Sequence, residues 1–446
     1  MSITVRRAGA FGVVALLALV APPLEGRFEP RVEAALAAVP FALVALYALL
    51  ADDEGYLFDV FARPGDFEEG RLYGLAGFSL AAAGLAIVAL RFGMPVAVFV
   101  TSVFVLAYGD LAQKGTLDVV GDRFLAISAF AAAGFGAGVL AQFASALLSG
   151  GAFDPPQAVF LAASGALLAA LLRSMLFERD DPLVMASVAL VLWLFTTLPL
   201  ELTATGVLAG VGVSVALGYV SYALETASVT GMLAGVLLAL LSVVLGDFGW
   251  FAVLISFFAV GGLSTKFRYE EKRERGIAED NEGARGSGNV LANSAAALVA
   301  LVAAAASPML GLPSRLFLFA FVGSVAAAMS DTLSSEIGGL YDDPRLITTL
   351  QRVPPGTDGG VTWQGELAGI AGAAVVAVIA VVAFSLSPLG VVVVVAAGVA
   401  GMTVDSLLGA TVEGVYVDNK GVNFAATTAA AFVGGALAVA TGLVVV

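Results

Sequence analysis

The fold is decided by a stretch without any charged residue, which lies between Glu366 and Asp405. Between these two carboxylates the chain reads LAGIAGAAVVAVIAVVAFSLSPLGVVVVVAAGVAGMTV. A helix needs only about 20 apolar residues to cross a bilayer, so this stretch is too long for one crossing. Ser385, Ser387 and Pro388 mark a turn near its middle. Because unsatisfied backbone groups are costly in lipid, the stretch predicts two helices joined as a membrane hairpin.

The rest of the chain repeats this apolar pattern. Of its 446 residues, 60% are hydrophobic and only 13% are charged, and the mean hydropathy is +0.98, whereas soluble domains carry roughly 25% charged residues. Apolar stretches between charges or Pro/Gly breaks mark the candidate spans. These stretches are residues 9–24, 33–50, 73–91, 93–109, 124–148, 156–176, 183–200, 203–222, 229–246, 249–263, 289–306, 314–330, 366–386, 388–403 and 424–446. The sequence therefore predicts an all-α, polytopic transmembrane helix bundle of about 14–15 spans in the cell membrane.

Two absent residue types limit the chemistry. The sequence has no Cys and no His, which excludes thiolate nucleophiles, zinc–thiolate sites and imidazole bases. The remaining carboxylates, hydroxyls, amides and basic groups suit Mg²⁺ and phosphate groups. The 21 basic and 35 acidic residues give a net charge of −14. This balance argues against a nucleic acid polymer as a partner and suggests a halophilic protein.

One polar loop, residues 264–288, sets the expected topology. It holds six of the 21 basic residues, and such loops remain in the cytoplasm. These six residues are Lys266, Arg268, Lys272, Arg273, Arg275 and Arg285. Two spans follow the loop, so residues 331–365 return to the cytoplasm, and the hairpin brings 404–423 back to the same side. We therefore expect the three polar segments to meet at the cytoplasmic face.

The end of the basic loop carries groups that suit a phosphate. It reads GARGSGNVLAN over residues 283–293 and places Arg285, Asn289 and Asn293 at the mouth of a helix. The two Asn residues are four apart and share one helix face, and a helix N-terminus favours anions. The pattern predicts a phosphate clamp that includes the preceding basic residues. The alternative is a juxtamembrane helix whose charges only hold the topology.

A second motif, SDTLSSEIGG, ends a span at residues 330–339. Asp331 and Ser335 are four apart, as are Thr332 and Glu336, so carboxylates and hydroxyls lie on adjacent helix faces. Carboxylates at membrane depth are rare and commonly functional, and oxygen ligands suit Mg²⁺ with substrate phosphates. The motif predicts a Mg²⁺ site, with a simple helix-terminal cap as the alternative.

A third motif, PPGTDGGVTWQGE, covers residues 354–366. Its consecutive glycines, Gly359 and Gly360, can turn backbone N–H groups inward as an anion-binding nest. Thr362 and Gly365 then open a helix. The alternative is an ordinary glycine turn.

The fourth motif, DSLLGATVEG, occupies residues 405–414 at the end of the hairpin. Asp405, Gly409 and Glu413 are spaced by fours, so a continuous helix would present two carboxylates on one face with a gap between them. That gap would admit a phosphate or a second metal ion. The alternative is a capped interfacial helix. Further polar residues follow the motif, namely Asn419, Lys420 and Asn423.

Together these motifs predict a site for phosphate and Mg²⁺. Phosphoryl transfer depends mainly on positioning and charge neutralisation. If the acceptor is a phosphate monoester, its oxygen is already anionic near pH 7, because its second pKa is about 6. Such an acceptor needs no strong general base, so the lack of His does not count against this chemistry.

The ordered motif set resembles the phytyl-phosphate kinase family of integral membrane proteins. The resemblance covers about residues 185–446 and rests on NVLANS (289–294), SDTLSSEIG (330–338), DGGVTWQG (358–365), DSLLGATVEG (405–414) and VN (422–423). It implies transfer of a phosphoryl group from a nucleoside triphosphate, typically CTP, to an isoprenyl monophosphate such as phytyl or geranylgeranyl phosphate. The product would be the diphosphate.

The resemblance also implies roles for individual residues. Asp331, Glu336 and Asp405 would be catalytic carboxylates, of which Asp331 and Asp405 would hold Mg²⁺. The other expected contacts to substrate or nucleotide are Lys266, Arg268, Lys272, Arg285, Asn289, Asn293, Thr332, Ser335, Gly359, Gly360, Thr362, Ser406, Gly409, Glu413 and Asn423.

The N-terminal part is expected to form a separate transmembrane bundle, residues 1–182, ahead of a kinase-like domain at 183–446. Its segment SVFVLAYGDLAQKG (102–115) faintly resembles residues 324–338, with Asp110 in the place of Asp331, and also the Gly-Asp motif of polyprenol kinases. The bundle would then be a degenerate kinase half or an accessory bundle. The basic and Gly-rich partners that such an active site needs do not follow Asp110 in the sequence.

A membrane transporter or flippase for a lipid-linked or anionic substrate is the alternative function. Glu201 and Glu225, near or inside spans, could serve it as a proton relay. Transporters place their polar site near the membrane midplane, however, whereas this chain concentrates polarity at one surface. A structural membrane scaffold is a third possibility.

Overall fold

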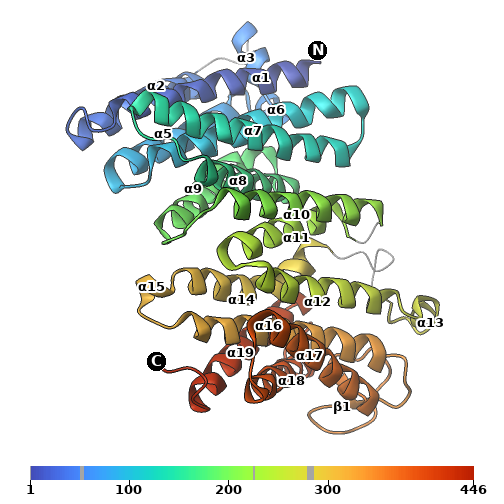
Figure 1. Cartoon of the computed structure of the whole chain (residues 1–446). Coiled ribbons are helices and arrows are strands. Elements are labelled where there is room, and N and C mark those ends of the chain that lie inside the picture. Colours follow the sequence, from blue (N-terminus) through green and yellow to red (C-terminus); the bar gives the residue numbers. More distant parts are fainter. Residues whose placement is uncertain (1, 51–54, 225–226, 279–285) are drawn as a thin grey trace. The chain divides into compact units, whose positions relative to one another are not determined.

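The computed structural model describes residues 2–50, 55–224, 227–278 and 286–446. The chain divides into two compact units, which are drawn together in Figure 1. Unit 1 comprises Met1–Leu198 with Leu202–Val207, and unit 2 comprises Pro199–Glu201 with Leu208–Val446. The division falls later than the boundary at 182/183 expected from the sequence. Helix α9 (Asp181–Thr197) belongs to unit 1 because its first residue, Asp181, pairs with Arg63 and Arg173 of that unit.

Unit 1 is built from long apolar helices joined by short turns (Figure 1). Its elements are α1 (Ile3–Ala15), η1 (Leu16–Val20), η2 (Pro22–Leu24), α2 (Pro30–Leu50), α3 (Tyr56–Phe61), α4 (Pro64–Glu69), α5 (Tyr73–Phe92), α6 (Val96–Val120), α7 (Arg123–Ser149), α8 (Pro155–Met175), η3 (Glu178–Asp180) and α9. Helix α6 lies at its centre, because nine apolar side chains along it are buried between Val96 and Ala107.

Unit 2 has the same character. Its helices are α10 (Ala204–Ala223, which begins in the last residues of unit 1), α11 (Val229–Leu241), η4 (Ser242–Gly246), α12 (Phe248–Lys266), α13 (Tyr269–Glu274), α14 (Ser287–Ala305), α15 (Ser307–Leu310), α16 (Ser314–Gly338), α17 (Trp363–Phe384), α18 (Pro388–Gly409) and α19 (Asn419–Ala440). Two short antiparallel strands, β1 (Arg345–Leu346) and β2 (Gly360–Val361), pair in the loop between α16 and α17.

The predicted fold class is confirmed. In the described residues, 15 helical segments are long and apolar enough to cross a membrane, as many as the sequence marked. The hairpin is confirmed as well, since α17 ends at Phe384 and α18 begins at Pro388. Ser385 adopts a left-handed conformation (φ 53°), and the Ser387 hydroxyl accepts a hydrogen bond from Gly390 N at 3.2 Å.

Small residues allow the helices of unit 2 to pack closely. A Cβ atom on Gly434 of α19 would lie 2.5 Å from the Phe319 carbonyl oxygen of α16, and one on Gly323 of α16 would lie 2.9 Å from Ala430 O of α19. Membrane helices associate through such small-residue contacts, because lipid supplies no hydrophobic driving force between them. Helix α16 also packs against α17 and α18, so both carboxylate-bearing helix ends are held in one bundle.

Three helices continue well beyond their predicted ends. Helix α6 reaches Val120 instead of residue 109, α16 reaches Gly338 instead of residue 330, and α18 reaches Gly409 instead of residue 403. In each case, the prediction stopped before a carboxylate: Asp110, Asp331 or Asp405. In α6 and α16 the charged side chains of the last turns are paired, Asp110 with Lys114 of its own helix and with Arg173, and Glu336 with Lys272.

Candidate active site

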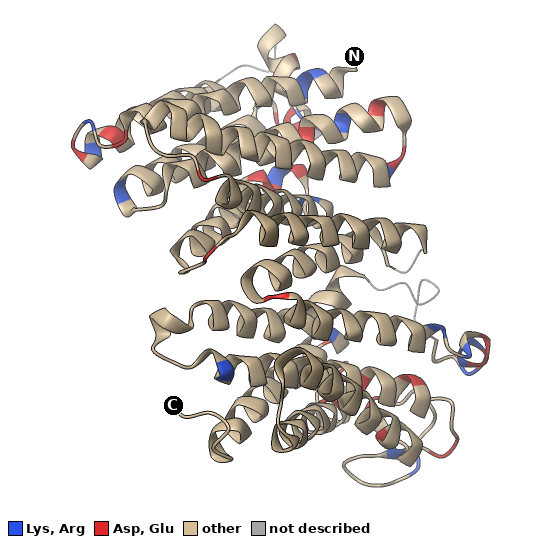
Figure 2. Ribbon diagram, viewed as in Figure 1, with Lys and Arg blue, Asp and Glu red and all other residues tan. Residues whose placement is uncertain are grey.

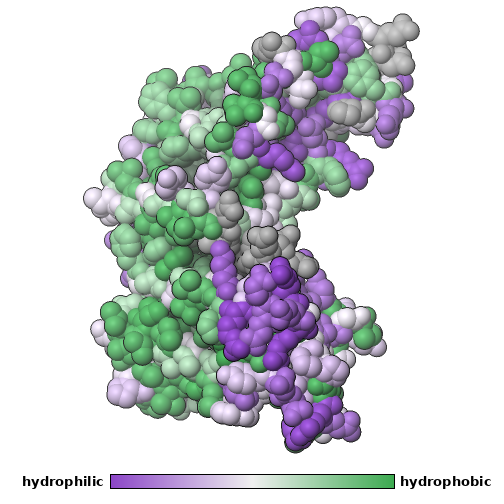
Figure 3. Space-filling view, turned by 90° about the vertical axis from the view of Figure 1, so that its right-hand side faces the viewer, coloured by the Kyte–Doolittle hydropathy of each residue, from purple (hydrophilic) through white to green (hydrophobic). Residues whose placement is uncertain are grey.

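The polar segments of unit 2 converge at one end of its bundle. Arg275, just after α13, donates to Asp342 beyond α16 at 3.0 Å. Gly359 lies against the last turn of α18, since a Cβ atom there would come within 2.6 Å of Ser406 O. Figure 2 shows charged residues gathered around α13 and the β1 loop, with few along the helices. Figure 3 shows hydrophilic residues over the same end of unit 2 and mainly apolar ones elsewhere on its visible face. The predicted meeting of these loops is therefore observed.

Two carboxylates from different helices form the centre of this end. The Asp331 carboxyl group, on α16, lies within hydrogen-bonding reach of Asp405 on α18. Asp405 Oδ2 is buried and has no hydrogen-bond partner among the described residues. A buried polar atom without a partner is costly and requires an explanation. The two helices thus bring together the carboxylates that the sequence assigned to a metal ion, although the two residues lie far apart in the chain.

The donor set fits Mg²⁺. No group of three or more acidic side chains that could enclose a metal ion occurs in the described part of the chain. Mg²⁺ is commonly held by only one or two carboxylates and keeps waters or substrate phosphates as its other ligands. A Mg²⁺ ion between Asp331 and Asp405 would also give Asp405 Oδ2 the partner that it lacks.

The glycine turn before α17 lies beside this pair of helices. Gly359 has a left-handed backbone (φ 72°), and a Cβ atom on it would collide with both Ala410 N and Ser406 O. Gly360 belongs to β2, which pairs with β1. Thr362 caps α17 by accepting a hydrogen bond from Gly365 N at 3.1 Å. Only glycine allows this turn to approach the end of α18, which is where a phosphate cradle was predicted.

The end of α18 differs from the prediction. The helix stops at Gly409, so Asp405 and Glu413 are not on one continuous helix face. The chain turns back, however, and Glu413 Oε2 would lie 3.3 Å from a Cβ atom on Gly409. Partial burial raises the pKa of Glu413, the Asp358 carboxylate raises it further, and a hydrogen bond from Asn419 opposes the shift. The turn after α18 therefore brings the Glu413 carboxylate close to Gly409, the last residue of that helix.

The predicted basic residues have different environments. Lys266 and Arg268 are exposed, and Arg268 pairs with Glu271. Lys272 is only 1% exposed, pairs with Glu336 and donates to Ser264 O at 2.7 Å. Arg285 lies outside the described residues. The structure thus places Lys272 as a partner of Glu336 and leaves Lys266 and Arg268 on the surface.

The hydroxyls of the second motif also differ in exposure. Thr332 is buried and Ser335 is exposed, although they lie within one turn of α16.

The asparagines lie at the beginnings of two adjacent helices. The Asn293 amide donates to Asn289 O at 3.0 Å, and the Asn423 amide donates to Asn419 Oδ1 at 3.1 Å. Both side chains are largely buried, and α14 packs against α19. The buried amide of Asn293 thus has the partner that its apolar surroundings require.

The sequence analysis named Lys420 among the polar residues after the fourth motif but assigned it no role in the site. Its side chain extends along α14, where a Cβ atom on Gly288 would lie 3.1 Å from Lys420 Nζ. Lys420 stands in the same polar stretch as Asn419 and Asn423, and that position was the available signal.

Glu201, named for a proton relay, is instead exposed in the loop between α9 and α10, and Glu225 lies outside the described residues.

Comparison with known proteins identifies the family. A model described as "Integral membrane protein DUF92" matches residues 212–442, which is more than half of the chain. The chain belongs to the DUF92 family of integral membrane proteins. This membership confirms the resemblance to the phytyl-phosphate kinase-like family, and the matched DUF92 region lies within unit 2.

Three relatives illustrate the extent of the similarity to DUF92 proteins. An uncharacterized membrane protein of Synechocystis sp. is 35% identical over 43% of this chain and 74% of its own length. An uncharacterized membrane protein of Methanocaldococcus jannaschii is 34% identical over 42% of this chain and 75% of its own. Protein VTE6, chloroplastic, of Arabidopsis thaliana is 36% identical over 27% of this chain and 36% of its own. No solved structure matches the chain.

Proposed function

We propose that unit 2 transfers the γ-phosphoryl group of a nucleoside triphosphate, CTP, to an isoprenyl monophosphate such as phytyl or geranylgeranyl phosphate. A phosphate oxygen of the acceptor forms a bond to the γ-phosphorus. At the same time, the bond between the γ-phosphorus and the oxygen that links it to the β-phosphate breaks. The products are the isoprenyl diphosphate and the nucleoside diphosphate. No C–O bond changes, and the acceptor oxygen is already ionised near neutral pH.

The observation that carries the proposal is the meeting of Asp331 and Asp405. The two carboxylates approach each other at one end of the bundle, and Asp405 Oδ2 is buried without a partner among the described residues. Asp331 and Asp405 would hold Mg²⁺, which would neutralise charge on the phosphates of the nucleotide. The turn at Gly359 supplies backbone close to the end of α18 for further phosphate contacts.

The bilayer suits the acceptor. The helices that end at this site expose apolar side chains along their length, such as Val378 and Val382 of α17 and Val392 of α18. An isoprenyl chain can therefore remain in lipid while its phosphate reaches the polar end of the bundle.

The topology supports a cytoplasmic site. If all 15 candidate spans cross the bilayer in turn, the loop after α12, the loop between α16 and α17, and the turn after α18 share one face. Only a few of the 21 basic residues then fall on the opposite face. Those residues are Arg27, Arg31, Arg91 and Arg315. The strong bias of the others follows the positive-inside rule.

The test is an assay with the full-length chain in detergent or lipid nanodiscs. The chain is incubated with Mg²⁺, γ-labelled CTP and geranylgeranyl or phytyl phosphate, and label in the isoprenyl diphosphate is measured. Transfer that requires Mg²⁺ and the monophosphate supports the proposal. Transport of either phosphate across the membrane, without any labelled diphosphate, would overturn it.

A control variant distinguishes loss of a carboxylate of the proposed site from loss of any other carboxylate at this end of unit 2. Asp343→Asn removes a carboxylate from the same polar end, where Asp343 is exposed and pairs with Arg352. Asn tolerates the left-handed backbone of this position (φ 62°). We expect Asp343→Asn to keep the activity that Asp331→Asn loses.

A further inference from the structure

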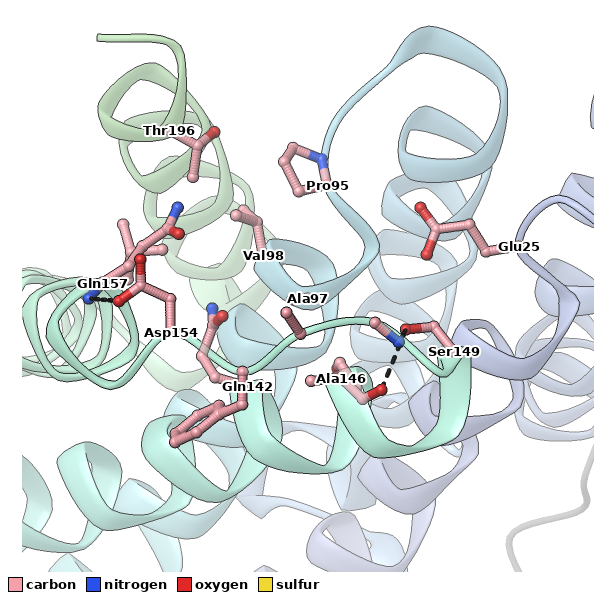
Figure 4. Close-up of a pocket in the computed structure, with 15 residues that line it drawn as sticks. Glu25, Pro95, Ala97, Val98, Gln142, Ala146, Ser149, Asp154, Gln157 and Thr196 are labelled. Atoms are coloured by element: carbon pink, nitrogen blue, oxygen red, sulfur yellow. Dashed lines mark hydrogen bonds between the residues drawn. The ribbon is translucent and has the colours of Figure 1, made fainter. Parts of the chain in front are cut away.

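Unit 1 contains a cavity of about 210 Å³ that the proposed kinase site does not use. Its lining comes from the ends of several helices, as Figure 4 shows: Glu25 follows η2, Pro95 precedes α6, Ser149 ends α7 and Thr196 lies near the end of α9. Cavities for drug-sized ligands measure about 300–1,000 Å³. This cavity therefore suits a smaller molecule or a single headgroup.

The floor of the cavity is polar and incompletely satisfied. Ser145 is only 3% exposed, and its hydroxyl oxygen has no hydrogen-bond partner among the described residues. Gln142 lies beside it and is held in place, because its amide nitrogen donates to Thr101 Oγ1 at 2.9 Å. The Gln142 amide oxygen is then left as an acceptor for a ligand.

The rim of the cavity is acidic. Figure 4 shows Glu25 and Asp154 on opposite sides of the cavity. No Lys or Arg occurs among the described residues that line it, although Arg27 and Arg31 follow Glu25 closely in the sequence. Burial raises the pKa of the Glu25 carboxyl group, and the nearby carboxylate of Glu33 raises it further. A positive charge at the rim would relieve this repulsion.

We propose that this cavity binds a small organic ammonium group, either a free amine or the headgroup of an aminolipid. The ammonium would lie between the Glu25 and Asp154 carboxylates and donate hydrogen bonds to Ser145 and Gln142. Pro95, Val98 and Phe153 would contact its carbon atoms. An anion is disfavoured by the two carboxylates, and a bare metal ion is much smaller than the cavity.

The position in unit 1 agrees with a ligand at the headgroup level. Helices α6 and α8 begin at the cavity and end near Lys114 and Arg173, which belong to a buried cluster of charges. The cluster end also carries Arg63, Arg71 and Arg123, so by the positive-inside rule it faces the cytoplasm. The cavity then opens at the outer face, where it is accessible to lipid headgroups and to external solutes.

The experiment uses the full-length chain in nanodiscs without aminolipid. Binding of propylammonium is measured by saturation-transfer NMR and compared with propan-1-ol, which has the same chain but no charge. We expect propylammonium to bind and propan-1-ol not to compete. The double variant Glu25→Gln/Asp154→Asn should weaken propylammonium binding at least tenfold, and Ser145→Ala should weaken it by a smaller factor. Asn at position 154 can still cap α8.

The control is Glu29→Gln, an exposed carboxylate at the same end that does not line the cavity, and it should bind propylammonium as the unmodified chain does. All variants are first checked for a monodisperse elution profile. Competition by phosphatidylethanolamine in the nanodisc would identify the lipid headgroup as the ligand, and lack of competition would identify a free amine. Equal binding by the double variant, or equal competition by propan-1-ol or potassium ions, would overturn the proposal.

Discussion

The ammonium group of Lys272 and the carboxylate of Glu336 form an ion pair in unit 2, with side-chain exposures of only 2% and 12%. The Lys272 ammonium also donates to Ser264 O at 2.7 Å and Thr265 O at 3.3 Å, the carbonyls at the end of α12. This contact fixes the end of α12 to the last turns of α16, one turn beyond Asp331. It therefore links the basic loop to the helix that carries the proposed metal ligand.

Removal of either partner should destabilise unit 2. Lys272→Met leaves the Glu336 carboxylate without its cation, and Glu336→Gln leaves a buried ammonium; breaking a buried pair in this way costs about 3–5 kcal/mol. The double variant should lose less than the sum of the two single losses. Denaturant unfolding of each variant in the same detergent measures this cycle. A purely additive result would show that the two groups do not interact.

Gly359 gives a sharper test of the proposed phosphate cradle. Gly359→Ala places a methyl group 2.6 Å from Ser406 O at a left-handed position, so the turn must move away from α18. We expect loss of most phosphoryl transfer. Gly414→Ala is the matched control, because Gly414 is also left-handed (φ 71°) but has no atom within 4 Å of a Cβ. The Gly414→Ala control carries only the cost of the left-handed backbone, about 1–2 kcal/mol, and should remain active. An equal loss of phosphoryl transfer in both variants would contradict a specific role for the close approach of Gly359 to α18.

Asp405→Asn should separate stability from activity. The substitution replaces a buried carboxyl group, whose Oδ2 lacks a partner among the described residues, by a neutral amide that can donate a hydrogen bond to the neighbouring Asp331. Without Mg²⁺, we expect the variant to be more stable than the unmodified chain by about 1–3 kcal/mol, the cost of an unsatisfied buried group. Added Mg²⁺ should stabilise the unmodified chain but not the variant, and phosphoryl transfer should be lost. Thermal unfolding with and without Mg²⁺ tests this, and a variant that is less stable in both conditions would argue for a structural role of Asp405.

The hydropathy of the sequence was sufficient to predict the helices but not the ends of several of them. The break at Ser385–Pro388 placed the hairpin correctly, because uncharged runs and turn residues are local signals. The end of α6 was missed because the Asp110 carboxylate pairs with Lys114 at 2.9 Å and with Arg173 at 3.1 Å. Lys114, which lies one turn later on the same helix, is the nearer of these two partners.

For the candidate site, too, local motifs could be predicted from the sequence, whereas contacts between segments far apart in the chain could not. The motifs around Asp331, Gly359 and Asp405 could be recognised in the sequence, and counting of spans brought them to one face. The pairing of Lys272 with Glu336 could not be foreseen, because it depends on how the segment after α12 folds back onto α16. The turn that returns Glu413 to Gly409 after the helix ends is likewise a tertiary feature.

The Glu413 carboxyl group predicts a pH dependence of stability. Its pKa in the folded chain is raised by partial burial and by the Asp358 carboxylate, so the folded state favours the protonated form. The stabilisation is therefore fully present below the ordinary glutamate pKa of about 4.3 and is lost as pH rises through the raised value. Relative to Glu413→Gln, the unmodified chain should lose stability over a series of rising pH values above about 4.3. Denaturant midpoints across this range test the sign, and a relative gain in stability with rising pH would contradict it.

The charge cluster of unit 1 should be essential for the folding of that unit. Arg173 contacts Asp110 at 3.1 Å and Asp181 at 3.2 Å, and all three side chains are nearly buried. Arg173→Met would leave two buried carboxylates with fewer cations, and breaking one buried pair already costs about 3–5 kcal/mol. We therefore expect a large fall in the unfolding midpoint, measured by intrinsic fluorescence. Arg179→Met is the control, because Arg179 is exposed and only stacks on Phe177, and its midpoint should change little. Equal midpoints for the two variants would show that the cluster contributes no more than a surface charge.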